Sequence, residues 1–259
     1  MRITIIGTGN VSSHITPALQ RAGHKIVGVT GRDNEKTETF AKTHKTKAFA
    51  TPQELPESDM VILAVTDDSI VKVASQLTVR KETIVVHTSG ATPMSSLGRA
   101  SSHIGVLYPC QTFTTGDKIE MAKTPFMIEG SDQETESVLM KLAGEISDIT
   151  PVRGTSEQRK ALHVAAVFAS NFTNHMIYRA ERILAGNGMK LGIMEQLVEQ
   201  TMKKAFRMGP YAAQTGPARR NDMETIKRHQ ELISDDKEAK AIYDIMTESI
   251  KTTYANRDE

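Results

Sequence analysis

The sequence predicts an α/β fold in which a mostly parallel sheet is followed by an all-α C-terminal domain. Short β-rich runs alternate with helical patterns through the first 150 residues. This alternation is typical of a parallel sheet covered by helices on both faces. From about Ser156 onward no run has the pattern of a strand. We therefore expect a sheet domain over residues 1–153 and a helical domain over residues 154–259.

The expected elements of the first domain follow one another in regular order. Strands are expected at Arg2–Ile6, Lys25–Thr30, Lys47–Ala50, Met60–Val65, Thr83–His87, Ile104–Tyr108, Phe126–Glu129 and Asp148–Val152. Helices are expected at Asn10–Ala22, Asn34–His44, Asp68–Leu77 and Gln133–Glu145. A capping box with proline at the first helical position predicts a further short helix from Thr51. Pro17 interrupts the first helical pattern, so we expect a kink near His14–Pro17.

Composition excludes several classes of protein. The chain has 259 residues, 39% of them hydrophobic, which is enough for a real core. Its net charge of +1 argues against a nucleic-acid-binding protein. Cys110 is the only cysteine, so no intrachain disulfide can form and no metal site is expected. The longest apolar run, Met60–Val65, is far shorter than the ~20 residues of a membrane-spanning helix. We expect a soluble cytoplasmic protein.

A glycine-rich loop at the start of the chain indicates a nucleotide site. The run Gly7-Thr8-Gly9-Asn10-Val11-Ser12 follows a strand and opens a helix. This is the context of the Rossmann dinucleotide fingerprint, in which the first glycine permits a tight turn and the second lets a pyrophosphate approach the backbone. The N–H groups at the helix start favour that anion. A purely structural turn is the alternative.

The end of the second strand indicates which dinucleotide binds. An NAD site usually has an acid about 20 residues after the glycines. Here Thr30 is followed by Gly31 and Arg32, and a guanidinium can form a bidentate contact with a 2′-phosphate. We therefore expect NADP(H), with Val65 and Thr66 lining the nucleotide from the fourth strand. The alternative for Arg32 is a solvated surface arginine.

Two more strand ends bear polar groups that suit a substrate. Because ligands of open α/β sheets lie beyond the carboxyl ends of the strands, His87, Ser89, Tyr108 and Gln111 are candidate substrate contacts. A packed tyrosine and a turn glutamine are the alternative. Cys110 has no evident activating partner, so we do not expect it to be a nucleophile.

The segment Ala161–Tyr178 contains no lysine, arginine, aspartate or glutamate. Apolar residues recur at helical spacing on one face, while the other face bears the neutral polar groups His163, Ser170, Asn171, Asn174 and Tyr178. Buried amides and hydroxyls need partners, at a cost of ~1–3 kcal/mol each when unpaired. A substrate, a neighbouring helix or a second subunit could supply them.

A third cluster follows the turn Thr215-Gly216-Pro217. Arg219 and Arg220 lie beside this rigid turn, and together they could bind an anionic substrate group. A solvated or interface arginine pair is the alternative.

These motifs together resemble a known family. Gly-x-Gly-Asn-Val at the start of the chain is followed by His-Thr-Ser-Gly (87–90) and Pro-Cys-Gln-Thr-Phe (109–113). His-Val-Ala-Ala-Val-Phe-Ala-Ser-Asn (163–171) and Thr-Gly-Pro-Ala-Arg-Arg-Asn-Asp (215–222) complete the pattern. The chain resembles bacterial oxidoreductases that join a Rossmann-like NADP-binding domain to a helical domain of unknown function. The family usually has histidine at the position of Tyr108 and glycine at that of Asn221.

The resemblance extends more distantly to pyrroline-5-carboxylate reductase, to the 6-phosphogluconate and 3-hydroxyisobutyrate dehydrogenases, and to deazaflavin-dependent NADP oxidoreductases. It implies a nicotinamide-binding domain, a helical dimerisation domain and an active cleft between them. The distant dehydrogenases use a lysine and an asparagine on the long helix. Asn171 matches that asparagine, whereas Val167 stands where the lysine would be.

The sequence thus predicts an NADP(H)-dependent oxidoreductase that acts on a small polar, anionic substrate. His163 is the expected acid or base, because histidine titrates nearest to neutral pH. Asn171 and Ser89 are expected to orient the reacting group, and Asn174 to contact the substrate. The alternatives are a non-catalytic NADP-binding sensor and a deazaflavin-dependent NADP oxidoreductase. A homodimer formed through the helical domain is the expected assembly.

Overall fold

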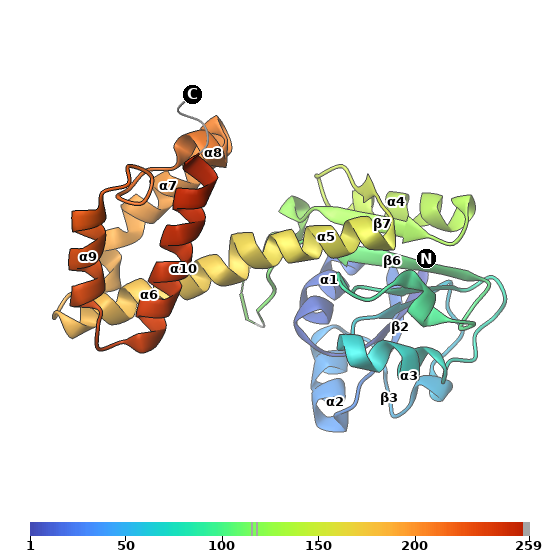
Figure 1. Cartoon of the computed structure of the whole chain (residues 1–259). Helices are drawn as coiled ribbons and strands as arrows, with labels where there is room; N and C mark the ends of the chain where they lie inside the picture. The colour runs from blue at the N-terminus through green and yellow to red at the C-terminus, as the bar shows by residue number, and fades with distance from the viewer. Residues whose placement is uncertain (115, 118, 256–259) are drawn as a thin grey trace. The chain divides into compact units, whose positions relative to one another are not determined.

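An eight-stranded sheet organises the N-terminal part of the computed structural model, which describes residues 1–114, 116–117 and 119–255 (Figure 1). Its strands are β1 (Arg2–Ile6), β2 (Lys25–Thr30), β3 (Ala48–Phe49), β4 (Met60–Leu63), β5 (Ile84–His87), β6 (His103–Pro109), β7 (Phe126–Gly130) and β8 (Val152–Arg153). The strand order is β3-β2-β1-β4-β5-β6-β7-β8. Neighbouring strands from β3 to β6 are parallel, which confirms the expected mostly parallel sheet.

The helices that the structure describes are α1 (Asn10–Arg21), α2 (Asn34–Thr43), α3 (Ile70–Ala74), α4 (Gln133–Ile146), α5 (Ser156–Ala166), α6 (Thr173–Gly186), α7 (Glu195–Met208), α8 (Pro210–Ala213), α9 (Met223–Leu232) and α10 (Lys237–Tyr254). A π-helix, Val167–Phe172, joins α5 to α6, so the uncharged segment is helical throughout. No strand follows β8 among the described residues, as the sequence predicts.

Local details differ from expectation at several places. The last strand, β8, begins only at Val152, whereas Asp148–Val152 was expected. The helix expected at Asp68–Leu77 begins as a 3₁₀ turn, Asp67–Ser69, and its α-helical part ends at Ala74. The short helix after Thr51 is also of the 3₁₀ type. β7 runs antiparallel to β6, because the chain returns directly to the neighbouring strand without a crossover helix.

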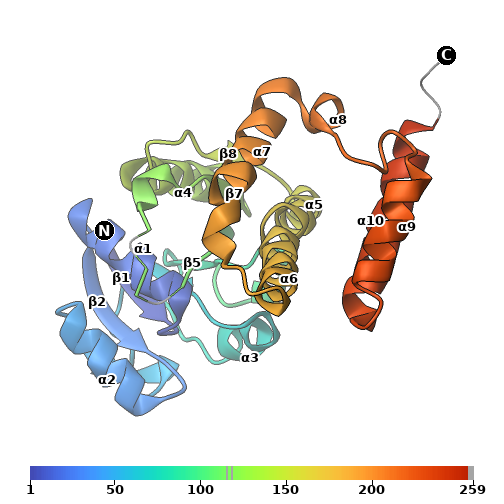
Figure 2. The same ribbon diagram turned by 90° about the vertical axis from the view of Figure 1, so that its left-hand side faces the viewer.

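The sheet is covered on both faces, and the alternation along β4 shows how. Met60 and Ile62 belong to one buried apolar cluster, whereas Val61 and Leu63 belong to the other. Successive side chains of a strand point to opposite faces, so one strand serves two cores. Helices α1, α2 and α4 supply the first cluster and α3 supplies the second. Figure 2 shows the same sheet and helices from the side.

The chain divides into two units, Met1–Ser170 and Asn171–Glu259. The first unit therefore includes α5 as well as the sheet. In the second unit α9 and α10 lie side by side in both views (Figures 1 and 2), and the His229 ring is 2.9 Å from the Tyr243 hydroxyl. In the part of the chain that the structure describes, no helix has the length and apolarity that crossing a membrane requires.

Candidate functional site

The pairing register brings the predicted loops of the first unit to one edge of the sheet. Ile6 pairs with Thr30 on one side and with Leu63 on the other, and Leu63 pairs with His87. β6 runs parallel to β5, so Tyr108 lies near the same edge. The carboxyl ends of these strands are where open α/β sheets bind ligands.

The glycine loop has the conformation that a pyrophosphate site needs. Gly7 has φ +107°, and a Cβ there would overlap the carbonyl oxygen of Ala64. A Cβ at Gly9 would meet no atom within 4 Å, so the space above this glycine is open. α1 begins without a side-chain cap and without an acid in its first turn. An uncapped helix start beside an open glycine fits an anionic diphosphate.

Arg32 lies close to that loop in the fold. A Cβ on Gly31 would be 3.3 Å from the Thr8 hydroxyl oxygen, so the first loop and the end of β2 are in near contact. The Arg32 side chain belongs to an exposed residue with no ion pair to the other described residues. The neighbouring Asp33 carboxylate accepts from the Lys36 N–H at 3.1 Å and thereby caps α2. The guanidinium is therefore available for a phosphate.

The end of β4 also borders this loop. Val65 lies 3.2 Å from the position that a Cβ of Gly7 would occupy. Thr66 is exposed, and its hydroxyl is 2.9 Å from that of Ser69. The structure thus brings together the residues predicted to bind the cofactor.

His163 and Tyr108 form a pair that the sequence analysis had named only separately. The Tyr108 hydroxyl is 3.2 Å from His163 Nδ1, and the ring planes cross at 72°. Burial raises the pKa of Tyr108 to about 12, and the Cys110 thiol adds to the effect. The tyrosine therefore stays protonated near neutral pH, and its hydroxyl can donate to the imidazole.

Gly90 makes this pair possible. A Cβ at this position would lie 2.6 Å from His163 Nδ1 and 2.8 Å from Tyr108 Cε2. Any side chain would displace the two rings. The motif His-Thr-Ser-Gly (87–90) thus ends in a glycine because the loop touches the imidazole. This role was missed, since the sequence does not show what lies against the loop.

His87 and Ser89 have local tasks in the same loop. The His87 ring is fully buried, and its Nδ1 accepts from the Ser89 N–H at 3.2 Å. Burial, with a contribution from the charge of Arg159, lowers the pKa of His87 to about 4, so this ring is neutral at physiological pH. The Ser89 hydroxyl accepts from the N–H groups of Ala91 and Thr92 at 3.1 and 2.9 Å. Its own proton remains available to a substrate.

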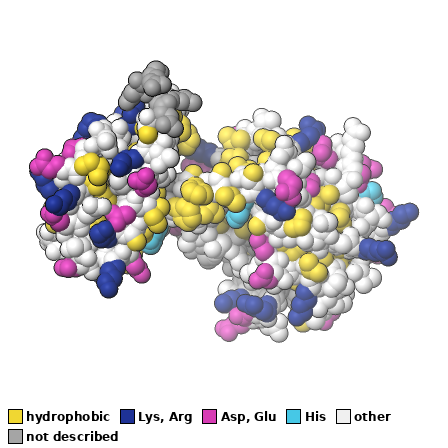
Figure 3. All heavy atoms as spheres, viewed as in Figure 1, with side chains coloured by type: hydrophobic (Ala, Val, Ile, Leu, Met, Phe, Trp, Pro, Cys, Tyr) yellow, Lys and Arg dark blue, Asp and Glu magenta, His cyan; other side chains and the backbone are white. Residues whose placement is uncertain are grey.

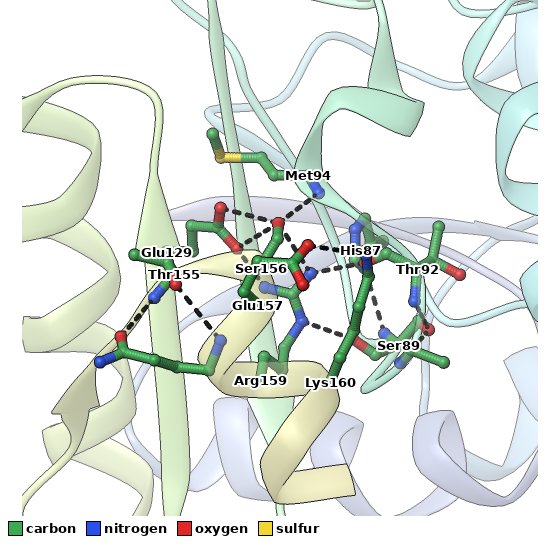
Figure 4. A network of polar contacts seen from close by, with 12 residues as sticks. His87, Ser89, Thr92, Met94, Glu129, Thr155, Ser156, Glu157, Arg159 and Lys160 are labelled. Atoms are coloured by element: carbon green, nitrogen blue, oxygen red, sulfur yellow. Dashed lines mark hydrogen bonds and ion pairs between the residues drawn. The ribbon is translucent and has the colours of Figure 1, made fainter. Parts of the chain in front are cut away.

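Arg159 is the largest feature that sequence reasoning missed. Its side chain is fully buried, and Figure 4 shows it among Ser89, Thr92, Glu129 and Ser156. A charged residue in the first turns of a helix ordinarily indicates solvent exposure. No local pattern identifies its partners, because they come from β7 and from the loop after β5.

Of the remaining candidates, Gln111 makes a local contact, and the two asparagines belong to the second unit. Gln111 is exposed, and its carbonyl oxygen accepts from the adjacent Thr112 N–H at 2.9 Å. Asn171, in the π-helix, and Asn174, in α6, are exposed residues of the second unit. Their role stays a prediction.

Both predicted arginines also belong to the second unit. The Arg219 guanidinium lies over the Tyr254 ring, 4.4 Å from its centroid, and Arg220 lies 4.0 Å from an Asp222 carboxylate oxygen. Asn221 has φ +54°, a left-handed conformation that asparagine tolerates and that explains the glycine usual in the family. The anion-binding role of the two arginines stays a prediction.

Two family models match the chain. A model described as NADP oxidoreductase, coenzyme F420-dependent, matches residues 2–90. A domain of unknown function (DUF2520) matches residues 124–250, which begin just before β7 and extend into α10. No curated protein matches.

Solved structures match nearly the whole chain. A Bacteroides fragilis protein provisionally named an NADP oxidoreductase is 32% identical, with 97% of this chain and 98% of that chain covered and a TM-score of 0.88. A reductive aminase from Aspergillus terreus, in complex with NADPH and ethyl levulinate, is 11% identical over 96% of this chain and 92% of that chain (TM-score 0.75). The 1-pyrroline-5-carboxylate reductase of Streptococcus pyogenes is 14% identical over 97% and 98% (TM-score 0.62). The last two similarities show the fold.

The sheet topology, the glycine loop and the matching structure show the NADP oxidoreductase fold. It has a Rossmann-like N-terminal domain and a helical C-terminal region. More narrowly, the chain belongs to the family of the Bacteroides fragilis protein. In this chain, a region that matches the model of F420-dependent NADP oxidoreductases is followed by DUF2520. The predicted resemblance to oxidoreductases with an NADP-binding domain and a helical domain of unknown function is confirmed. Pyrroline-5-carboxylate reductase shares the fold.

Proposed function

We propose that the chain is an NADP(H)-dependent oxidoreductase that transfers hydride to or from a small polar, anionic substrate. One observation carries the proposal: the open glycine loop and the Tyr108–His163 pair lie at the same edge of the sheet. A dinucleotide pocket beside a titratable pair is the arrangement expected of a nicotinamide-dependent reduction.

The residues of the first unit fit the cofactor. The loop Gly7–Val11 would bind the pyrophosphate, Thr30 and Arg32 the 2′-phosphate, and Val65 and Thr66 would line the nucleotide. Bound NADPH would supply the hydride. The protein must then supply a proton and hold the reacting carbon next to the nicotinamide.

His163 is the proposed proton donor or acceptor, and Tyr108 is its partner. The tyrosine hydroxyl, protonated because burial raises the pKa of Tyr108 to about 12, can donate to Nδ1. The opposite ring nitrogen, Nε2, then bears the proton that an alkoxide or amine product needs. The Ser89 hydroxyl can orient a polar substrate group at the same loop.

Calorimetry with NADPH, NADH and NADP⁺, followed by a screen of carbonyl and imine substrates that monitors NADPH absorbance, tests this function. We expect tight binding of NADPH, weaker binding of NADH, and turnover that His163→Gln abolishes. The matched control is His24→Gln, since His24 precedes β2 and so lies at the opposite edge of the sheet. Absence of NADPH binding would refute the proposal. Different affinities for NADPH and NADP⁺ without any hydride transfer would identify a sensor instead.

The family model that matches residues 2–90 favours one second candidate, because its description names coenzyme F420. In that case the deazaflavin, and not a small polar substrate, exchanges hydride with NADP(H). Titration with F420, followed by its absorbance, separates the two functions. Micromolar F420 binding and F420-dependent NADPH oxidation would support the second candidate, and no binding would support the first.

We also propose that two copies pair through the second unit. Of its described residues only Ile226, Ala239 and Tyr254 are buried. Meanwhile Phe206 is 90% exposed and Ile193 75% exposed. A unit of this size normally buries most of its apolar surface, so a second copy is the natural cover.

Apolar side chains are also exposed at the end of the first unit. Hydrophobic side chains gather along α5 in Figure 3, where Val164 is 56% exposed, and Phe168 in the π-helix is 66% exposed. Within the second unit an apolar hollow of about 350 Å³ lies between α6, α9 and α10. Sedimentation equilibrium tests the dimer.

The single cysteine suits a reducing compartment, and we propose the cytoplasm as the location.

A further inference from the structure

The guanidinium of Arg159 holds three segments of the first unit together. Its Nε donates to the Ser89 carbonyl at 3.1 Å and one terminal nitrogen donates to the Thr92 carbonyl at 2.5 Å. The other terminal nitrogen forms an ion pair with the Glu129 carboxylate of β7. Glu129 in turn accepts from the Ser156 hydroxyl at 2.9 Å, which attaches the first turn of α5 to the sheet (Figure 4).

These contacts end one residue away from the Tyr108–His163 pair. Ser89, whose carbonyl Arg159 binds, precedes Gly90, and Gly90 lies directly against both rings. His163 also follows Arg159 by four residues on α5, so the two side chains leave neighbouring positions on the same face of the helix. Arg159 thus fixes the backbone on one side of the imidazole and the helix that bears the imidazole on the other.

We propose that Arg159 is a positioning residue, which sets the distance between His163 and Tyr108 by holding the 89–92 loop against the first turns of α5. This positioning role depends on the proposed function only where it predicts a change in turnover. Arg159 does not touch the reacting atoms, and its effect passes through the loop. Glu129 balances the buried positive charge, without which the guanidinium would not remain inside.

The geometry of the contacts requires arginine and would not be met by a lysine. The planar fork reaches two carbonyls and a carboxylate in different directions, which an ammonium on a flexible stem cannot reproduce. Arg159→Lys therefore keeps the charge and removes the fixed geometry. Arg153→Lys is the matched control, because Arg153 also donates to a glutamate, Glu136, at 2.5 Å but lies at an exposed site.

The test uses the full chain labelled with isotopic nitrogen in histidine. The Nδ1 resonance of His163 is assigned with His163→Gln, and Tyr108→Phe gives its position when the hydrogen bond is absent. We expect Arg159→Lys to move this resonance most of the way toward the Tyr108→Phe position, and Arg153→Lys to leave it unchanged. NADPH affinity, measured by calorimetry, should be the same in both variants. With a substrate from the screen, kcat should fall about tenfold or more in Arg159→Lys while the KM for NADPH stays constant.

An unchanged His163 resonance in Arg159→Lys would overturn the proposal, whatever happens to activity. If that variant fails to fold, Glu129→Gln keeps the arginine and weakens its anchor, and the resonance must then move in the same direction. Loss of NADPH binding in the wild-type protein would refute the proposed function but leave the NMR result decisive for the position of His163.

Discussion

Arg32→Ser removes the side chain on which the choice between NADPH and NADH depends in the proposed site. The residue is exposed and makes no hydrogen bond or ion pair with other described residues, so the fold should be unaffected. Its neighbour Asp33 already caps α2 through the Lys36 N–H and remains in place. The variant therefore changes the nucleotide contact and little else.

The expected loss follows from the chemistry of the contact. A hydrogen bond to a charged group contributes about 1.5–3 kcal/mol, and exposure of Arg32 places its contribution near the middle of that range. About 2 kcal/mol corresponds to a roughly thirtyfold increase in the Kd for NADPH. NADH lacks the 2′-phosphate, so its Kd should not change. The loss should also shrink at high salt, which screens an exposed charge.

Calorimetric titration with both nucleotides at two salt concentrations measures this difference. Arg99→Ser is the matched control, since Arg99 is an exposed arginine that precedes β6 and so lies at the opposite edge of the sheet. It should alter neither Kd. Equal weakening of NADPH and NADH by Arg32→Ser, or an unchanged preference for NADPH, would show that another group recognises the phosphate.

Three further substitutions test the remaining geometry. Gly90→Ala should lower kcat about a hundredfold, because its Cβ displaces the His163 ring by most of an ångström. The control is Gly144→Ala in α4, whose Cβ would meet nothing within 4 Å. It should leave kcat unchanged in the same turnover assay. Asp132→Ala should cost about 1 kcal/mol of stability at neutral pH, because its carboxylate caps α4 by accepting from the Thr135 N–H at 2.8 Å. That hydrogen bond, foremost among several, holds the pKa of Asp132 far below its usual value, so the difference in thermal unfolding between wild type and variant should be full above about pH 4 and disappear as pH falls through the depressed pKa. Phe206→Glu should convert the proposed dimer to monomers in sedimentation equilibrium, since at 90% this ring has the highest exposed fraction among the large hydrophobic side chains of the described residues. An unchanged mass would place the interface elsewhere.

The sheet and the cofactor loop could be predicted because local chemistry specifies them. Gly7 needs a left-handed conformation, and Gly9 needs open space, so a sequence of two glycines after a β-rich run identifies both requirements. The apolar runs of β4 and β5 are buried on both faces, which is why they are continuous rather than alternating. In each case the residue type and its immediate neighbours are sufficient.

The same reasoning found His163 and Tyr108 but not their contact. The two residues are 55 positions apart, and only the parallel pairing of β5 with β6 and the attachment of α5 bring the Tyr108 hydroxyl to 3.2 Å from His163 Nδ1. The π-helix was also missed, because its backbone hydrogen bonds depend on packing rather than on composition. Sequence patterns thus named both residues of the pair and left their geometry open.

Arg159 shows why that geometry is not a local property. Its partners lie 30 and 70 positions away, at Glu129 and Ser89, and each is unremarkable in its own segment. A buried cation is costly unless its partners are in place, so the arginine can be inside only in the folded arrangement that also sets Gly90 against His163. The same long-range contacts therefore stabilise the first unit and hold the loop that touches the Tyr108–His163 pair. Substitutions within this network should accordingly change stability and chemistry together, whereas Gly9→Ala in the glycine loop, where a Cβ would meet nothing within 4 Å, should change nucleotide affinity alone.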